Sequence, residues 1–313
     1  MLQINKVFTT RPDVSFDASG LFLRKFPKTR QIGINCIILK IDRNAQIIYH
    51  RNVKKWVIVS HCAYNHFSTK NRQRKMRMID IHTHLLFGVD DGPDTIEESI
   101  EMLRHAKAQG IDAMILTPHY RHGMFAYPND KIKENFARLY EPAKKIGIDL
   151  YLGTEHHVNS MMLEYIQTGR VRTLANTQYV LAEYKHDTEY EYIVKTVRDL
   201  LRNGYIPIIA HVERYMCMHE DIDRIDHLRD LGAMIQVNAN AILGMEGFKA
   251  KGFTKKLLKY GYVDFVASDS HDLKKRANNL GKCRDYLYKK YDERYVDKLI
   301  ERNAIEILES IGR

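Results

Sequence analysis

The sequence predicts an α/β fold built on a parallel sheet of seven strands, with closure into a barrel preferred over an open doubly wound sheet. Three observations predict it. From Met78 onward, short apolar segments alternate with amphipathic segments of helical period, as in βαβ units. Several of the short segments contain β-branched residues, as expected of strands buried on both faces. A His, Asp or Glu follows nearly every one of them, at the edge that carries the active site in βα barrels.

The strands are predicted from apolar runs of four or five residues. The first run begins with Met78 and leads directly into two histidines. In chain order the predicted strands are Met78–Ile81, Ala113–Thr117, Asp149–Leu152, Tyr179–Glu183, Ile206–Ala210, Ala233–Val237 and Val263–Ala267.

The helices are predicted from capping residues and from glycines that end the apolar period. Thr95-Ile-Glu-Glu98 has the pattern of a capping box and opens a helix that Gly110 closes. Thr188-Glu-Tyr-Glu191 has the same pattern, in a segment that closes near Gly204. Further helices are predicted over Asn129–Gly147, Glu220–Gly232 and Thr254–Gly261, with two more between Lys274 and Ile311.

Charge is divided unevenly along the chain. The 313 residues carry a net charge of +10, yet residues 1–77 hold 16 Lys and Arg against three acids, a net of +13. Residues 78–313 hold the other 33 basic and 36 acidic residues, a net of −3. The larger part of the chain therefore has no basic footprint for nucleic acid.

Three interpretations compete for the basic segment of residues 1–77. It could be an arm for nucleic acid or membrane, a targeting peptide, or a stretch that precedes the natural start of the protein near Met76 or Met78. The third is preferred, because apolar runs such as Ile34–Ile41 and Trp56–Ser60 lack a helical period or turn punctuation. We expect this segment to be poorly ordered and dispensable, and residues 78–313 to form the functional domain.

Cellular setting is indicated by the cysteines and by the absence of targeting signals. No apolar run is long enough to span a bilayer, and the first residues lack the apolar core of a secretory signal. The four cysteines are scattered without a close pair, which favours neither a disulfide framework nor a zinc ribbon. A reducing, cytoplasmic setting without membrane insertion is therefore expected.

The first predicted strand ends in a candidate metal site. His82 and His84 are one residue apart, so in an extended segment both side chains point to the same side. Asp90 and Asp91 return a carboxylate after a short loop. A lone His-x-His is more often a pair of surface histidines than a metal site, so the prediction depends on the other strand ends.

Six of the seven predicted strands end in, or are followed by, a residue that can ligate a metal. Asp269-x-His271 repeats the spacing of His82-x-His84 after the last strand, and only the sixth strand, ending at Asn238, lacks a His or acid. Together, imidazole and carboxylate ligands suit Zn, Mn or Fe, so a polynuclear metal centre is predicted. The remaining strand ends supply His119, Glu155, Glu183 and His211.

These residues resemble the PHP (polymerase and histidinol phosphatase) metal-dependent phosphoesterases. Within that superfamily, residues 78–311 are most similar to the bacterial tyrosine-protein phosphatases of capsule and exopolysaccharide loci, the CpsB/YwqE type. The resemblance rests on Ile79-Asp-Ile-His-x-His, Val89-Asp-Asp-Gly, Thr117-Pro-His, Gly153-x-Glu155, Ile209-Ala-His-x-Glu-Arg214 and Ala267-Ser-Asp-x-His271. It implies a distorted seven-stranded (β/α)7 barrel, while residues 1–77 match nothing in the family.

The resemblance also implies a ligand set and a reaction. Arg214 and Arg276 would bind the phosphate, and a metal-bridging hydroxide would attack phosphorus. Three divalent ions are implied, Mn most often, with Fe or Zn as alternatives. The implied ligands are His82, His84, Asp91, His119, Glu155, Glu183, His211, Asp269 and His271.

Two questions about residues within the motifs stay open. Either Asp90 or Asp91 could be the ligand, and Asp91 is preferred. His156 and His157 follow Glu155, where the family usually has an apolar residue, so one of them could alter the metal site or point away.

The substrate implied by the resemblance is a phosphotyrosine protein, the Tyr-rich tail of a bacterial tyrosine kinase that controls polysaccharide export. Another PHP activity, such as histidinol-phosphate phosphatase, is the alternative. A phosphatase loop of the Cys-x5-Arg type is excluded, because Asp42, Ser68, Asp223 and Lys289 stand six positions after the four cysteines. Arg121 and His122 could meet the phosphate or the peptide.

Overall fold

The computed structural model describes residues 77–125 and 127–312, together with the backbone of four strands nearer the N-terminus. Two compact units, Met1–Arg74 and Lys75–Arg313, make up the chain. The first contains an antiparallel sheet in the order β1-β2-β3-β4. Its strands are Arg30–Gln31, Cys36–Lys40, Ala45–His50 and Lys55–Ser60, none of which the sequence analysis assigned. The expectation that residues 1–77 are poorly ordered and dispensable falls largely outside the described residues and stays a prediction.

All seven predicted strands of the second unit are present and parallel, so the α/β prediction is confirmed. Their bounds differ from the predicted ones by at most two residues. The strands are β5 (Met78–Thr83), β6 (Ile111–Leu116), β8 (Asp149–Leu152), β10 (Tyr179–Glu183), β11 (Ile206–Ile209), β12 (Met234–Asn238) and β13 (Phe265–Ala267).

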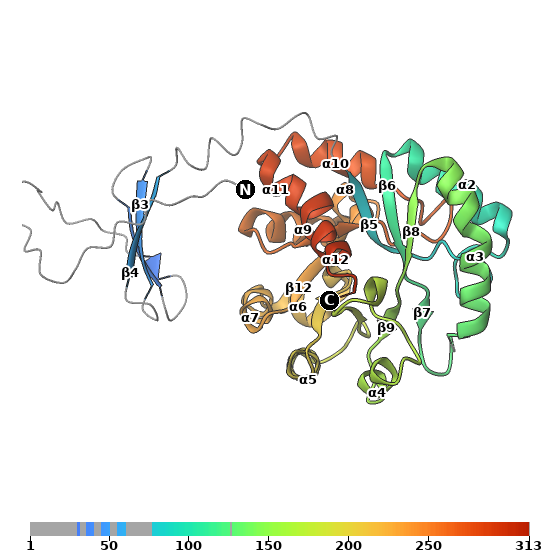
Figure 1. Cartoon of the computed structure of the whole chain (residues 1–313), viewed down its shortest axis with the longest axis horizontal. Coiled ribbons are helices and arrows are strands. Elements are labelled where there is room, and N and C mark those ends of the chain that lie inside the picture. Colours follow the sequence, from blue (N-terminus) through green and yellow to red (C-terminus); the bar gives the residue numbers. More distant parts are fainter. Residues whose placement is uncertain are drawn as a thin grey trace, which may run out of the picture. The chain divides into compact units, whose positions relative to one another are not determined.

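Two short strands were not predicted, and they divide the parallel strands into two curled sheets (Figure 1). β7 (His119–Tyr120) follows β6 after two residues, and β9 (Glu155–His157) follows β8 in the same way. One sheet has the order β5-β6-β8 and the other the order β13-β12-β11-β10-β9-β7. The described hydrogen bonds therefore form sheets of three and six strands, and one continuous seven-stranded barrel is not assigned.

A glycine is required where β8 breaks before β9. A Cβ atom at Gly153 would lie 2.9 Å from Leu174 Cδ2 and 3.1 Å from Ile115 Cγ2. The Gly153 amide meanwhile donates to the Leu116 carbonyl at 2.7 Å, which keeps the backbone against β6. The break shifts the chain onto β7 and β10 and so directs Glu155 inward.

The first and last parallel strands are joined through the backbone beyond their ends. Thr83 forms an isolated parallel bridge with Ser270. Asp269 N donates to His82 O and His84 N donates to Ser270 O, each at 2.9 Å. The residues that follow β5 and β13 are thereby held side by side.

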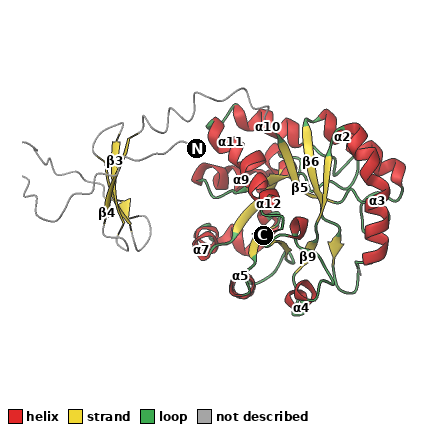
Figure 2. Ribbon diagram, in the orientation of Figure 1, coloured by secondary structure: helices red, strands yellow, loops and turns green. Residues whose placement is uncertain are grey.

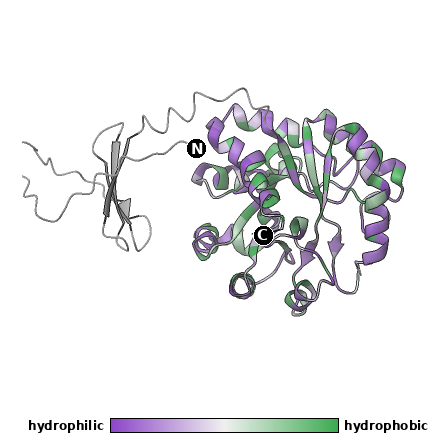
Figure 3. Ribbon diagram, viewed as in Figure 1, coloured by the Kyte–Doolittle hydropathy of each residue, from purple (hydrophilic) through white to green (hydrophobic). Residues whose placement is uncertain are grey.

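Helices cover the outside of the parallel strands, and the apolar strand residues lie inside them (Figures 2 and 3). α2 (Ile96–Ala108) begins with the predicted capping box at Thr95, and α3 (Asn129–Ile146) ends at Gly147 with a left-handed cap. The prediction of a capping box at Thr188 is wrong. The Thr188 amide closes a turn onto Lys185 O at 3.0 Å, so α5 (Tyr190–Arg202) begins later, with Glu189 as its N-cap.

The other predicted helices are present with different bounds. The Glu220–Gly232 prediction corresponds to α7, which begins after a separate short helix, and the Thr254–Gly261 prediction corresponds to the longer α9. The tail forms one helix and then a continuous helical stretch that includes a π-helical turn. The remaining helices are α4 (Met162–Gln167), α6 (Met216–Glu220), α7 (Asp223–Leu231), α8 (Ala239–Leu243), α9 (Phe248–Tyr260), α10 (Leu280–Tyr288), α11 (Glu293–Asp297) and α12 (Asn303–Glu309), with the π-helical turn at Lys298–Arg302.

Asp80 is a buried carboxylate that fastens β5 to the segment around β13. Its Oδ1 accepts from Ser268 N at 3.0 Å and its Oδ2 accepts from Asn278 Nδ2 at 2.9 Å. Burial raises the pKa of Asp80, although hydrogen bonds from Ser268 and His82 oppose the shift. The side chain therefore joins residues nearly 200 positions apart in the chain.

Removal of the Asp80 carboxylate should destabilise the parallel unit. We expect Asp80→Ala to lower the free energy of unfolding by about 3 kcal/mol, because buried donors lose their acceptor. Asp80→Asn, which retains one acceptor oxygen, should cost about half as much. Urea unfolding followed by circular dichroism in the presence of EDTA measures both. The exposed Asp285→Ala control should change stability by less than about 0.5 kcal/mol; an equal loss there would contradict the assignment.

Candidate metal centre

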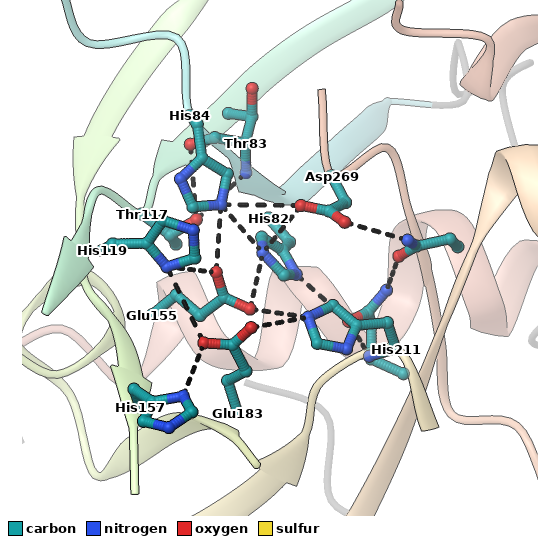
Figure 4. Close-up of polar contacts among 12 residues, drawn as sticks. His82, Thr83, His84, Thr117, His119, Glu155, His157, Glu183, His211 and Asp269 are labelled. Carbon is teal, nitrogen blue, oxygen red and sulfur yellow. Dashed lines mark hydrogen bonds and ion pairs between the residues drawn. The ribbon is translucent and has the colours of Figure 1, made fainter. Parts of the chain in front are cut away.

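All nine predicted ligands lie together where the parallel strands end. Figure 4 shows seven of them, all except Asp91 and His271. Parallel strands place their carboxyl ends at the same edge of a sheet, and each ligand is within two residues of such an end or in a loop folded over it. The geometric condition for a polynuclear centre is therefore met by residues spread from position 82 to position 271.

Glu155 is at the middle of the cluster. Its side chain is fully buried, and its two oxygens face four imidazoles. Oε1 lies 3.2 Å from His82 Nε2 and 2.8 Å from His211 Nε2, while Oε2 lies 3.1 Å from His84 Nε2 and 3.0 Å from His119 Nδ1. Burial alone would raise the pKa of Glu155, but the imidazoles hold it well below its usual range.

The tautomers of the two strand-end histidines follow from their outer hydrogen bonds. His82 Nδ1 donates to Gln236 Oε1 at 3.1 Å, and His84 Nδ1 donates to Asp90 Oδ2 at 2.8 Å. In the neutral rings each Nε2 therefore presents a lone pair to the interior, and the two Nε2 atoms are 3.3 Å apart. A histidine whose outer nitrogen donates to a carboxylate or carbonyl oxygen is the usual arrangement of a metal ligand.

Three groups of side chains have ligand atoms within 4.8 Å of one another and could each hold a metal ion. The group that contains Asp269 shares His84 with one of the other groups and Glu155 with the other, so the three sites adjoin. His211 is in none of the groups, but it contacts Glu155 and lies 3.9 Å from Glu183. The groups are His84, Asp91, His119 and His271; His82, His84, Glu155 and Asp269; and His119, Glu155 and Glu183.

Asp90 and Asp91 have different surroundings. Asp90 is buried and accepts hydrogen bonds from His84 Nδ1 and from His119 N at 2.9 Å, so it orients histidines rather than facing the cluster. Asp91 Oδ1 lies 3.4 Å from His119 Nε2 and 3.2 Å from His271 Nε2. Of the two, Asp91 is the carboxylate placed with the other candidate ligands.

The two histidines after Glu155 also point in different directions. His156 is buried with its Nε2 2.8 Å from the Arg172 carbonyl, away from the cluster, and burial lowers the pKa of His156 to about 4. His157 turns toward the cluster, and its Nδ1 lies 3.0 Å from Glu183 Oε2 (Figure 4).

Two of the candidate ligands have a backbone conformation that costs energy. His211 has φ 29° and Asp269 has φ 50°, a region that residues other than glycine rarely adopt. Each follows the end of a strand, where the left-handed turn redirects the side chain into the cluster. Such conformations cost about 1–3 kcal/mol each and are concentrated at functional sites.

The two predicted phosphate-binding arginines flank the cluster. Arg214 lies 2.8 Å from Asp269 Oδ2 and Arg276 lies 3.2 Å from Asp269 Oδ1. Arg276 also contacts Asp91 Oδ2 at 3.2 Å, and Arg214 contacts Glu246 at 3.5 Å. Both side chains are about one-third exposed, so their guanidinium groups reach solvent as well as the cluster.

The donor set fits divalent cations. Glu155 Oε2, His119 Nδ1 and His271 Nε2 are buried. Their close contacts with one another and with Asp91 lack hydrogen-bond geometry, so none of the three has a hydrogen-bond partner among the residues that the structure describes. Burial alone would lower the pKa values of His84 and His119, but the adjacent carboxylates raise both to about 9. The cluster thus concentrates negative charge around imidazoles, a setting that favours positive charge, and its ligand types suit Zn, Mn or Fe.

The centre reaches solvent through a cavity of about 300 Å³. Glu183, His211 and Arg214 are among its lining residues, together with Tyr184 and Tyr215. A substrate group can therefore approach the cluster and one of the arginines from the same side.

Comparison with known proteins assigns the family. The model of the family described as "Capsular polysaccharide synthesis, CpsB/CapC" matches residues 78–309. The chain belongs to the CpsB/CapC family. The match covers the unit that contains the metal-centre candidates, and residues 1–77 lie outside it.

Relatives in this family include named tyrosine-protein phosphatases. CpsB of Streptococcus pneumoniae is 35% identical over 238 residues, covering 74% of this chain and 98% of that protein. CpsB of Streptococcus agalactiae is 33% identical over 240 residues, covering 74% of this chain and 99% of that protein.

Solved structures agree with the family assignment. A structure from the work on YwqE from Bacillus subtilis and CpsB from Streptococcus pneumoniae, described as "unique metal-dependent tyrosine phosphatases", is 31% identical with a TM-score of 0.64. The match covers 70% of this chain and 90% of that chain. A lactonase from Listeria monocytogenes, at 12% identity and a TM-score of 0.50 over 74% of this chain and 94% of that chain, shares the fold alone.

Sequence reasoning missed residues that support the cluster without facing it. Gln236 accepts from His82 Nδ1 and, at 2.8 Å, from His211 N, so one amide oxygen orients two candidate ligands. Asn238 donates to Asp269 Oδ2 at 3.0 Å and to Glu246 Oε1 at 3.2 Å. The two-residue period of β12 could have placed Gln236 and Asn238 on one face, but only their partners show their role.

The different positions of His119, in the cluster, and His156, which points away from it, give a direct test of the cluster. We expect His119→Ala to lower the bound Mn²⁺ content strongly, because His119 belongs to two of the candidate groups. His156→Ala should keep its metal content and lose about 2–3 kcal/mol of stability, because a buried ring and its hydrogen bond are removed. Metal analysis after dialysis and urea unfolding measure these outcomes. Metal loss in His156→Ala equal to that in His119→Ala would contradict the placement.

Proposed function

We propose that this chain is a metal-dependent protein-tyrosine phosphatase. The proposal rests chiefly on the buried cluster around Glu155, which has two arginines at its edge. Relatives in the same family are named tyrosine-protein phosphatases. The similar solved structures are described as metal-dependent, in agreement with the donor set. No helix in the described part of the chain is both long and apolar enough to cross a bilayer.

We assign the nine candidate ligands to three adjoining divalent ions, with Mn²⁺ the first choice and Fe or Zn the alternatives. The three overlapping groups support this number, since each has three or four ligand atoms. His211 would complete the group around Glu155 and Glu183. The ligands are His82, His84, Asp91, His119, Glu155, Glu183, His211, Asp269 and His271.

The side chains of the site suit hydrolysis of a phosphate monoester. Divalent ions supply Lewis acidity and lower the pKa of bound water, so that hydroxide is available near neutral pH. Arg214 and Arg276 would bind the phosphoryl oxygens, for which the planar guanidinium is well matched. Asp269 and Glu246 hold Arg214 in place, and Asp269 and Asp91 do the same for Arg276.

The described cysteines do not support a thiolate route. Cys217 and Cys283 are buried free thiols, and burial raises the pKa of each. Neither lines the cavity that leads to the cluster.

Further predictions rest on the resemblance. The substrate is proposed to be the Tyr-rich tail of a bacterial tyrosine kinase of polysaccharide export, in the cytoplasm. We also propose that the parallel strands form the family's distorted seven-stranded barrel, for which the Thr83–Ser270 bridge is the supporting observation.

Hydrolysis should depend on metal and on His211. We expect the full-length protein with Mn²⁺ to hydrolyse a phosphotyrosine peptide, and EDTA to abolish this activity. His211→Ala should lower kcat/KM by about 10²–10³-fold, as loss of a group acting directly at a reaction centre does. The exposed His227→Ala on α7 is the matched control and should stay within twofold. Metal-free turnover would contradict the mechanism.

The proposed substrate, a phosphotyrosine peptide, can be compared directly with the alternative, histidinol phosphate. We expect the phosphotyrosine peptide to have a higher kcat/KM than histidinol phosphate under the same conditions, with phosphate release as the measurement. A preference for histidinol phosphate would replace the proposed activity with the other PHP reaction.

Residues 1–75 should be dispensable for activity. A chain that starts at Met76 keeps Arg77, whose backbone N donates to Glu301 Oε1 at 2.8 Å and whose side chain pairs with Asp149. We expect this shortened chain to match the full-length kcat/KM within twofold. A soluble but inactive product would show that the N-terminal residues contribute to the site.

A further inference from the structure

A second cavity adjoins the one that leads to the metal centre. It has a volume of about 730 Å³ and shares Arg121, His157, Tyr184 and Lys185 with the smaller cavity of about 300 Å³. The two form one cleft that runs from Glu183 toward the outside. Each cavity by itself is within the range of roughly 300–1,000 Å³ typical of ligand sites.

The cleft is built on the ends of three neighbouring strands. Tyr120 of β7 pairs with His156 of β9, and Glu183 of β10 pairs with His157 of β9. Because these strands are parallel and in register, the residues just beyond their ends form adjacent walls. Arg121 follows β7 directly, and Lys185 comes two residues after β10.

One wall is fixed to the metal centre by a ring stack. Arg121 and Phe125 form an antiparallel bridge, with backbone hydrogen bonds of 3.0 and 2.8 Å. The Phe125 ring lies parallel to the His119 imidazole, with centroids 5.3 Å apart and planes inclined by 6°. The turn that carries Arg121 is therefore positioned relative to a candidate ligand.

The outer cavity is positively charged. Arg121 and Lys185 line it along with His122 and His157, and none of its lining residues is an Asp or Glu. Within the described part of the chain, neither Arg121 nor Lys185 has a carboxylate within ion-pair distance. Arg214 and Arg276, by contrast, are both held by carboxylates of the centre.

We propose that this outer cavity binds the polypeptide on one side of the phosphotyrosine and selects acidic side chains there. The proposal rests on the proposed function and adds a substrate class to it: phosphotyrosine flanked by Asp or Glu. Unpaired cations in a concave surface attract anions, and a peptide joined to the phosphotyrosine must leave the inner cavity through its opening.

The apolar residues of the outer cavity suit the rest of such a peptide. Its lining includes Tyr184, Val158, Tyr192 and Met124, and the last two have 41% and 61% of their surfaces exposed. An exposed methionine and an exposed tyrosine in one cavity offer contact area for side chains of varied shape, while Arg121 and Lys185 supply the charge preference. A small phosphate ester would fill the inner cavity alone and would not reach Val158, Met124 or Tyr192, which line the outer cavity but not the inner one.

The test compares peptides that differ in charge alone. Three phosphotyrosine peptides carry Glu, Gln or Lys at the same flanking positions, in sets placed before and after the phosphotyrosine. We expect the Glu peptide of one set to exceed its Gln counterpart about fivefold in kcat/KM, as expected of two partly exposed charge pairs. In Arg121→Gln/Lys185→Gln this ratio should fall below twofold, and high salt should reduce it in the unmodified protein.

The matched control removes one Arg and one Lys elsewhere. Arg198 on α5 and Lys256 on α9 are exposed and do not line the cleft, so Arg198→Gln/Lys256→Gln should keep the fivefold ratio. The proposal would be overturned if Arg121→Gln/Lys185→Gln had the same ratio as the unmodified protein, or if neither peptide set showed a preference for Glu.

A binding measurement separates this proposal from the proposed activity. Fluorescein-labelled peptides with a non-hydrolysable phosphonate in place of the phosphotyrosine are titrated with the Mn²⁺-loaded protein, and anisotropy gives Kd. A lower Kd for the Glu peptide that Arg121→Gln/Lys185→Gln loses would support peptide selection by the cleft, even if no phosphotyrosine peptide were hydrolysed. Hydrolysis with equal Kd for Glu and Gln peptides would overturn the cleft and leave the activity standing.

Discussion

The contacts of the Glu155 carboxylate are the constraint on which the rest of the site depends. One buried side chain faces four imidazoles. Two of them come from the end of β5, one from β7 and one from the turn after β11. A buried charge is tolerated only when it is paired, so the strands cannot move apart without exposing an uncompensated carboxylate. The same arrangement that suits cations therefore also fixes the geometry of the strand ends.

The local structure around this carboxylate shows how it is achieved. The break after β8 needs Gly153, whose neighbours leave no room for a Cβ, and it carries Glu155 under the imidazoles. The left-handed turns at His211 and Asp269 do the same for their side chains. Each of these departures from regular strand geometry costs stability, and each directs a candidate ligand inward, which indicates that the edge is organised for function.

Sequence patterns predicted what depends on local order and on the polarity of parallel strands. The apolar runs gave the seven strands, and their common direction gathered residues from His82 to His271 at one edge. β7 and β9 could not be predicted, because strands of two or three residues exist only through their pairing with β9 and β10. Gln236 was missed for a related reason, since its role comes from two contacts made across the sheet.

The basic residues of the site fall into two classes that sequence alone does not separate. Arg214 and Arg276 are paired with carboxylates that surround the centre, and in the proposed function both bind the phosphate there. Arg121 and Lys185 have no such partner among the described residues. They line the outer cavity, which has no Asp or Glu in its lining, as well as the inner one, which has Glu183 and Asp187. An unpaired cation is costly only where it is deprived of water. The half-buried Arg121 and the exposed Lys185 are therefore stable without a partner and remain available to a substrate. In the two proposals, charge at the centre binds the phosphate, and charge in the cleft distinguishes the polypeptides that carry it.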